Sequence, residues 1–173
     1  MITEQPAAIE TIAPVEHRFT TDDGVDLSYA EYGPRSGVPI VICHGIAVDS
    51  TQFVKDAEFF AARGYRVLTP DLRGHGRSGV APTRQENYTL ARLARDQAQM
   101  LDHAGIDRAN WVGNSLGGMV GLSVLAFHAD RLLSLTTFGT PYELRLPSPG
   151  VKPFVAINFR LWRPFVVHIA AAL

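Results

Sequence analysis

The sequence predicts an α/β fold in which a mostly parallel sheet carries helices on both faces, and three observations point to it. The run Val38–Cys43 is apolar throughout, which suits a strand covered on both sides by helices. Short runs of this kind alternate with longer segments of helical periodicity, an order typical of right-handed β-α-β crossovers. The length of 173 residues, 46% of them hydrophobic, matches one core of single-domain size.

A flexible tail is expected over residues 1–14, which contain prolines and glutamates and no basic start followed by an apolar run. The first ordered unit is a predicted hairpin of strands His17–Thr21 and Val25–Tyr32. Between them, Asp22-Asp23-Gly24 supplies a residue free to take positive φ. The core of the fold is expected to span residues 15–139.

A helix and a further strand are expected after Val38–Cys43. The helix spans residues 49–63, with Asp49 or Ser50 as its N-terminal cap and Gly64 at its end. Its apolar positions at helical spacing are Phe53, Ala57, Phe60 and Ala61. Tyr65–Thr69 is the predicted next strand.

The second half of the core repeats this alternation. A helix is predicted from Thr89 to Ala104, ending at Gly105, and a short buried strand follows at Asn110–Val112. A helix over residues 116–128 and a strand over residues 132–138 come next. The last of these is about the sixth strand of the sheet.

Residues 140–173 differ in composition, because prolines interrupt many apolar residues. This pattern is typical of the start of a helical lid or cap. The uninterrupted run Phe165–Leu173 is far shorter than the ~20 residues that cross a bilayer, so no membrane span is expected.

Composition restricts the partners. The formal net charge is −1, with 16 basic and 17 acidic residues, which gives no electrostatic footprint for nucleic acid or an anionic membrane. A small, neutral or apolar substrate is the expected partner. Cys43 is the lone cysteine, so it has no partner for an internal disulfide, and no Cys/His cluster has zinc-site spacing. We expect no metal and no cofactor, and, without a secretory leader, a cytoplasmic location.

The pentapeptide Gly113-Asn114-Ser115-Leu116-Gly117 lies between a predicted strand and a predicted helix. This context indicates a nucleophile elbow, a sharp turn that exposes the Ser115 hydroxyl in a strained conformation. Gly113 and Gly117 are required because a Cβ at either position would collide with the backbone. The alternative is that Ser115 merely caps the helix that follows.

The loop His44-Gly45-Ile46 follows the predicted central strand. Ligands collect at the carboxyl ends of such strands, so this loop is expected beside the elbow. The backbone N–H groups of Ile46 and Leu116 would then converge on a developing oxyanion. His44 is either a general base or a hydrogen-bonding partner of the loop backbone, and we favour the second role.

The segment from Asp71 to Gly79 contains the spacing GxGxxG, which is also the dinucleotide-binding fingerprint. The context argues against NAD, because Asp71, Leu72 and Arg73 separate the glycines from the strand and no apolar helix follows at once. A shaped loop beside the active site is expected instead. Asp71 and Arg73 would hold it through charge-assisted hydrogen bonds.

Taken in order and at these separations, the hairpin, His44-Gly45, the loop after Asp71 and the Gly-Asn-Ser-Leu-Gly-Gly elbow resemble the α/β-hydrolase superfamily. The resemblance covers roughly residues 15–139. It implies Ser115 as the nucleophile, the N–H groups of Ile46 and Leu116 as the oxyanion hole, and a substrate-shaping lid from Pro141 onward. Members with aspartate at the elbow, such as haloalkane dehalogenases and epoxide hydrolases, are disfavoured by Ser115.

The same resemblance implies an acid and then a histidine after later strands. Only His128 and His168 follow Ser115, and neither has that context, nor do Asp130 and Glu143. No residue is assigned to either role, and we expect a fold truncated after about the sixth strand, with very weak turnover by this chain alone. The apolar sheet edge at residues 132–138 would then be open to self-association.

The sequence therefore predicts a serine hydrolase that attacks a small ester or related carbonyl compound through an acyl-enzyme intermediate. One alternative is a catalytically silent hydrolase-fold module that binds a ligand or a protein. Another is an acyltransferase or cofactor-free haloperoxidase, which differs only in the acceptor that takes the acyl group.

Overall fold

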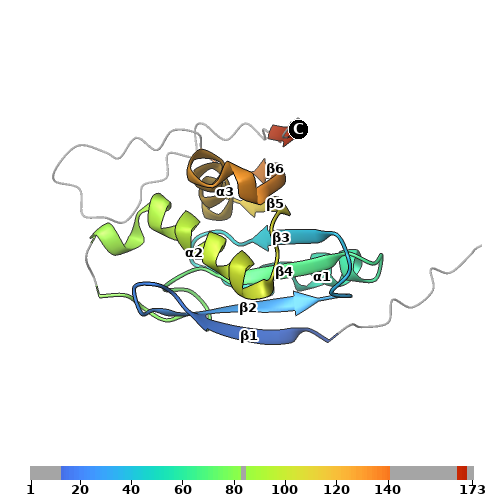
Figure 1. Ribbon diagram of the computed structural model, residues 1–173, viewed down its shortest axis with the longest axis horizontal. Helices are drawn as coiled ribbons and strands as arrows, with labels where there is room; N and C mark the ends of the chain where they lie inside the picture. Colours follow the sequence, from blue (N-terminus) through green and yellow to red (C-terminus); the bar gives the residue numbers. More distant parts are fainter. Residues whose placement is uncertain (1–12, 83–84, 141–166, 171–173) are drawn as a thin grey trace, which may run out of the picture.

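The computed structural model describes residues 13–82, 85–140 and 167–170. Their strands form one seven-stranded sheet in the order β1-β2-β4-β3-β5-β6-β7 (Figure 1). The strands are β1 Val15–Thr20, β2 Asp26–Tyr32, β3 Pro39–Cys43, β4 Arg66–Asp71, β5 Ala109–Asn114, β6 Leu132–Phe138 and β7 Val167–Ala170. The α-helices are α1 Val54–Ala61, α2 Leu90–Ala104 and α3 Leu116–Phe127, and the 3₁₀ helices are η1 Ser50–Phe53, η2 Gln85–Tyr88 and η3 Ala129–Arg131.

The middle of the sheet is parallel. β4 and β5 both pair in parallel with β3, and β6 pairs in parallel with β5. A helix connects each successive pair of these strands along the chain, as parallel pairing requires. The hairpin of β1 and β2 adds to one side, where β2 runs antiparallel to β4. The predicted α/β fold with a mostly parallel sheet is confirmed.

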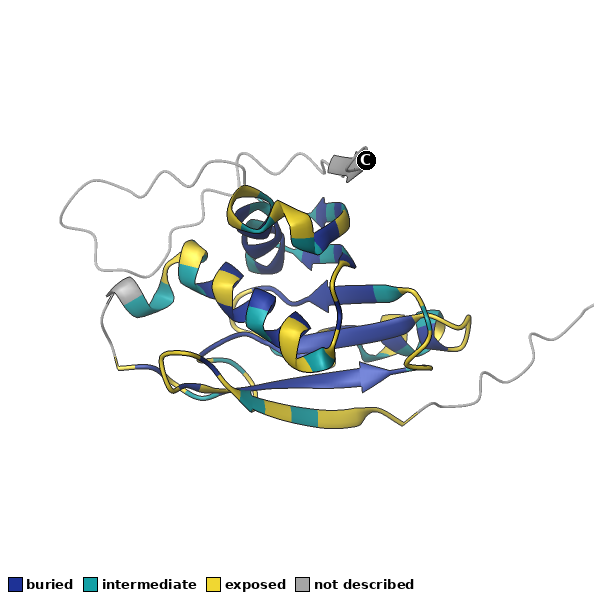
Figure 2. Ribbon diagram, in the orientation of Figure 1, coloured by how far each residue is buried: buried dark blue, intermediate teal, exposed yellow. Residues whose placement is uncertain are grey.

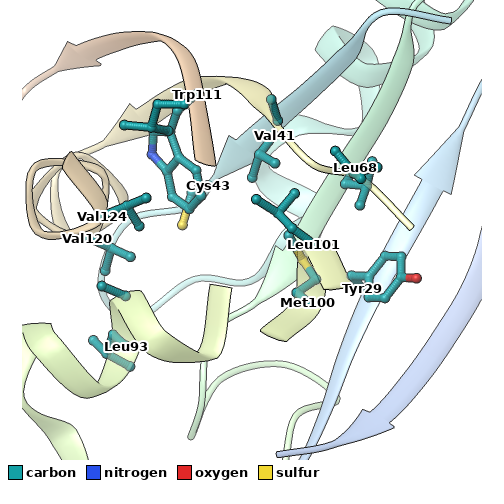
Figure 3. Close-up of a cluster of buried hydrophobic side chains, with 14 of the residues drawn as sticks. Tyr29, Val41, Cys43, Leu68, Leu93, Met100, Leu101, Trp111, Val120 and Val124 are labelled. Atoms are coloured by element: carbon teal, nitrogen blue, oxygen red, sulfur yellow. The ribbon is translucent and has the colours of Figure 1, made fainter. Parts of the chain in front are cut away.

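Helices cover both faces of the sheet (Figure 1). The side chains of each strand alternate between these faces. On one face, α2 and α3 pack over a cluster that includes Val41, Leu68 and Trp111 (Figure 3). On the other, α1 packs over a smaller cluster that includes Ile40 and Val67. The central strands are buried and β1 is largely exposed (Figure 2), so the core surrounds the strands that end at the site described below.

The helix boundaries follow local capping chemistry. Thr89 accepts a hydrogen bond from the Arg92 N–H at the start of α2, and Gly105 ends that helix with φ of 65°. Asp49 likewise caps η1 by accepting from the Thr51 N–H. The single helix predicted over residues 49–63 is thus two consecutive elements, η1 and α1, divided at Phe53 and Val54.

The predicted end of the sheet at residues 132–138 is wrong. β7 pairs antiparallel with β6 over Ser134–Thr137, so β6 is an internal strand and the outer strands of the described sheet are β1 and β7. The β-branched residues Val167 and Ile169 favour this extended pairing. Self-association through a sheet edge stays a prediction, and it would involve one of the outer strands.

The predicted lid lies mostly outside the described residues, as do residues 1–12 of the tail predicted over residues 1–14. Of the lid range 140–173, the structure describes Thr140 and residues 167–170, and the latter form a strand where helices were expected. In the described part of the chain, every helix is too short or too polar to cross a bilayer.

Candidate active site

The candidate site lies where the parallel strands end. β3, β4 and β5 end at Cys43, Asp71 and Asn114, and the loops that follow these residues come together at one edge of the sheet. In parallel sheets this carboxyl edge is where ligands bind. The sequence-predicted loop at His44 and the predicted elbow at Ser115 both lie here.

Ser115 forms a sharp turn between β5 and α3. Its backbone has φ of 48° and ψ of −109°, a conformation that a side chain other than glycine adopts only under strain. The Ser115 N–H donates to the Phe138 carbonyl oxygen at 3.0 Å, which holds the turn against the end of β6. The Ser115 side chain makes no capping hydrogen bond to α3, so the alternative of a simple helix cap is wrong.

The two elbow glycines are places of close backbone approach. A Cβ built on Gly113 would lie 2.4 Å from the Gly117 carbonyl oxygen. One built on Gly117 would lie 2.2 Å from the carbonyl oxygen of Cys43. Both distances are far inside van der Waals contact, as expected from the sequence. The absence of these methyl groups lets α3 start directly against the end of β3.

The loop after β3 lies against the elbow. A Cβ on Gly45 would be 3.5 Å from the Ser115 Cβ, which places the two segments in contact. Ala47 in this loop has φ of 62°, and Ala47 and Ser115 are the two non-glycine residues with positive φ in the described chain. Strained backbone of this kind clusters at functional sites.

The two predicted oxyanion donors belong to these strained segments. Leu116 is the first residue of α3, and Ile46 is half exposed in the turn before Ala47. Among the described residues, no hydrogen-bond acceptor is found for the backbone N–H of either Ile46 or Leu116. Both N–H groups thus lack a partner within the described part of the chain.

His44 is fully buried and has both ring nitrogens engaged. Nδ1 donates to the Gly45 carbonyl oxygen at 2.7 Å, and Nε2 accepts from the Leu72 N–H at 3.0 Å. Desolvation by burial lowers the pKa of His44 below its ordinary value of 6.5. The imidazole is therefore a neutral link between the loops after β3 and β4, the role that we favoured over general base.

Asp71 joins η1 to the loop after β4 at the same edge of the sheet. Its carboxylate accepts from the Ser50 N–H at 2.8 Å and from the Arg77 N–H at 3.0 Å. Burial acts to raise the pKa of Asp71, but these hydrogen bonds outweigh it and hold the pKa below its ordinary value. The cluster borders a cavity of about 320 Å³ that Ser115 does not line.

Arg73 anchors the loop after β4 to α2 and to the hairpin turn. Its guanidinium makes paired hydrogen bonds to Asp96 and to Asp23, as the sequence predicted for a charge-tethered loop. No helix starts at Gly74, Gly76 or Gly79; instead the Gly74 N–H bonds back to the Gly79 carbonyl oxygen. The dinucleotide-binding geometry is therefore absent from this segment.

The described part of the chain does not complete a catalytic triad of serine, histidine and acid. His128 ends α3, at the opposite end of the helix from Ser115, and His168 lies in β7 with its backbone opposite Thr136. Asp130 follows in the exposed η3, and Glu143 lies outside the described residues. The same described residues hold no group of three or more His, Cys, Asp or Glu side chains arranged to bind a metal.

Sequence reasoning missed one residue of the site, Gln52. Its side chain bonds to both Gly45 and Asn114, which directly precede the predicted oxyanion donor Ile46 and the predicted nucleophile Ser115. The periodicity of residues 49–63 placed Gln52 on a helix with no assigned role. No sequence motif marks it, because its contacts depend on where η1 lies relative to the elbow.

Comparisons with known proteins agree with the fold described above. A family model described as alpha/beta hydrolase fold matches residues 38–164. Epoxide hydrolase A of Mycobacterium tuberculosis is 33% identical over 153 residues, which cover 88% of this chain and 46% of that protein. A bifunctional esterase/perhydrolase of Acinetobacter calcoaceticus is 36% identical over 99 residues, 57% of this chain and 35% of that protein.

Among solved structures, a hydrolase from Pseudomonas aeruginosa superposes with a TM-score of 0.65 at 32% identity, covering 69% of this chain and 44% of its own. The chain belongs to the α/β-hydrolase family. It spans about half the length, or less, of the relatives that it matches.

Proposed function

We propose that this chain carries the nucleophile and oxyanion hole of a serine hydrolase that acts on a small ester or related carbonyl compound. The observation that carries the proposal is the strained backbone of Ser115 at the junction of β5 and α3, with its hydroxyl free of any capping bond. That strain is retained because the packing of Gly113 and Gly117 dictates it. Attack of the Ser115 oxygen on the carbonyl carbon would give an acyl-enzyme, which water then hydrolyses.

The N–H groups of Ile46 and Leu116 would stabilise the oxyanion formed in that attack. Both are unpaired, and Leu116 is at the N-terminus of α3, where the helix dipole favours negative charge. Two fixed donors of this kind need no reorganisation as the charge develops. The exposed apolar side chains of Ile46 and Val48 in the same loop favour an apolar substrate beside Ser115.

Activation of Ser115 requires an imidazole that accepts its proton. His44 does not meet this requirement, because both of its ring nitrogens are committed to loop backbone. In the described part of the chain, no histidine side chain hydrogen-bonds to Ser115. The proposal therefore names no residue of this chain as the base or as its orienting acid.

A perhydrolase reaction is a second candidate, favoured by the relative named as an esterase/perhydrolase. It would share the same acyl-enzyme at Ser115 and differ in the acceptor, with hydrogen peroxide replacing water. Epoxide opening is less well supported despite the relatives of that name, because the elbow position carries a hydroxyl and not a carboxylate.

A fluorophosphonate probe tests the proposal directly. We expect slow labelling of the folded chain, because the described side chains supply no imidazole that activates the hydroxyl. The label should be located at Ser115 by peptide mass spectrometry and lost in Ser115→Ala. Ser123→Ala is a matched control, because Ser123 lies on α3 about two turns beyond the elbow and should leave labelling unchanged. A folded protein that resists the probe would instead support a silent binding module.

A further inference from the structure

Gln52 bridges the two segments that carry the proposed nucleophile and oxyanion donors. Its Oε1 accepts from the Gly45 N–H at 3.1 Å, and its Nε2 donates to the Asn114 Oδ1 at 3.2 Å. We propose that Gln52 is a positioning residue, which sets the separation of the oxyanion loop from the elbow. This inference rests on the function proposed above for Ser115.

The two ends of the bridge are adjacent to the reacting groups. Gly45 immediately precedes Ile46, and Asn114 immediately precedes Ser115. The two segments already touch, because a Cβ on Gly45 would lie 2.9 Å from the Asn114 Oδ1. A displacement of either segment would therefore change the angle between the Ile46 and Leu116 donors.

Asn114 passes the constraint to the end of β6. Its Nδ2 approaches the Phe138 carbonyl oxygen at 3.4 Å, and the same oxygen accepts from the Ser115 N–H at 3.0 Å. Gln52, Asn114 and Phe138 thus form one polar chain across the carboxyl ends of β3, β5 and β6. Ser115 bonds to the last member of that chain.

Gln52 is itself held on both sides within η1. The Ser50 N–H donates to the buried Asp71 carboxylate at 2.8 Å. Phe53 is buried edge-on against the Phe138 ring, with ring centroids 6.1 Å apart. The backbone under Gln52 is therefore fixed although its side chain is exposed. An exposed amide adds little to global stability, which separates a positioning role from a structural one.

Gln52→Ala tests the role, with Gln99→Ala as a matched control. Gln99 makes the same two-ended amide bridge, accepting from the Asp22 N–H at 2.9 Å and donating to the Asp22 Oδ1 at 2.7 Å, but it is on α2. We expect Gln52→Ala to lower the second-order rate of fluorophosphonate labelling about tenfold, the scale of a small loss of alignment. Gln99→Ala should label at the wild-type rate.

A second measurement does not depend on chemistry at Ser115. Hydrogen exchange of the Gly45 amide should accelerate in Gln52→Ala, because its acceptor is gone, while exchange in the core strands and the unfolding midpoint stay at wild-type values. Asn114→Ala combined with Gln52→Ala should slow labelling no further than Asn114→Ala alone, since both act through one bridge.

The outcomes separate the two proposals. If the wild-type chain does not label, the proposed function fails, and the Gly45 exchange rate alone decides the inference about Gln52. If the wild-type chain labels, an unchanged labelling rate in Gln52→Ala would overturn the positioning role of Gln52. The same role would be overturned by an unchanged exchange rate of the Gly45 amide. A uniform rise in exchange together with a lower unfolding midpoint would also overturn it, because Gln52 would then be a structural residue.

Discussion

Arg73 Nε donates a hydrogen bond to Asp96 Oδ2 at 2.8 Å, and both side chains are completely shielded from solvent. The same guanidinium binds Asp23 in the hairpin turn, and Asp96 also accepts from Arg92 on its own helix. Burying such charges costs several kcal/mol unless every one is paired. This network therefore joins α2, the hairpin and the loop after β4 in a way that tolerates no missing partner.

Asp96→Ala should lower the free energy of unfolding by about 3–5 kcal/mol, because it leaves the Arg73 guanidinium buried without this carboxylate. Urea denaturation followed by circular dichroism measures the change. Asp102→Ala is the control, since Asp102 is 63% exposed in its ion pair with Arg131 and should cost no more than about 1 kcal/mol. Equal losses in the two variants would contradict this account.

The buried His44 makes stability depend on pH in a defined direction. Its pKa is held below 6.5 in the folded chain, so the unfolded chain binds a proton more readily. The free energy of unfolding should therefore fall as pH drops below 6.5, by at most about 1.4 kcal/mol per pH unit from this residue. Denaturation curves between pH 7.5 and 5 should show a shallower dependence in His44→Gln; the same slope in both proteins would refute the assignment.

Ser115→Gly should be more stable than Ser115→Ala by about 1–2 kcal/mol. Glycine adopts a φ of 48° without the steric cost that alanine retains, and neither variant has the hydroxyl. Thermal unfolding of the two variants measures the difference. Identical stabilities would show that the turn relaxes once the serine is removed.

Gly117→Ala should cost about 3 kcal/mol in the free energy of unfolding and should also abolish labelling at Ser115. The added methyl would overlap the Cys43 carbonyl oxygen, so α3 would have to move away from β3. Gly64→Ala is the comparison, because a Cβ there meets no atom within 4 Å and only its φ of 85° is unfavourable, at about 1–2 kcal/mol. A Gly117→Ala protein as stable as Gly64→Ala would argue against the tight elbow.

Local chemistry explains why much of the fold could be predicted. Thr89, Gly105 and Asp49 cap their helices through contacts within a few residues, and the glycines of the elbow mark a turn that only they permit. The expected roles of His44, Asp71 and Arg73 as loop tethers are also found. These features depend on short sequence separations or on a motif whose context is local.

What could not be predicted depends on long-range placement. β7 pairs with β6 from about thirty positions further along the chain, and no local pattern among its few apolar residues distinguishes such a strand from a lid segment. Gln52 gains its contacts because η1 is held by Asp71 and Phe138, which belong to two other strands. The nucleophile and oxyanion roles themselves stay proposals that the labelling experiment addresses.

Trp111 lies fully buried beneath the elbow, and its Nε1 donates to the Gly117 carbonyl oxygen at 3.0 Å. The chain contains one other tryptophan, Trp162, which lies outside the described residues. In a Trp162→Phe protein, tryptophan fluorescence would come from a single indole that is bonded to the turn at Ser115. The emission of Trp111 would therefore report changes in that turn in real time, for example when an inhibitor reacts with Ser115.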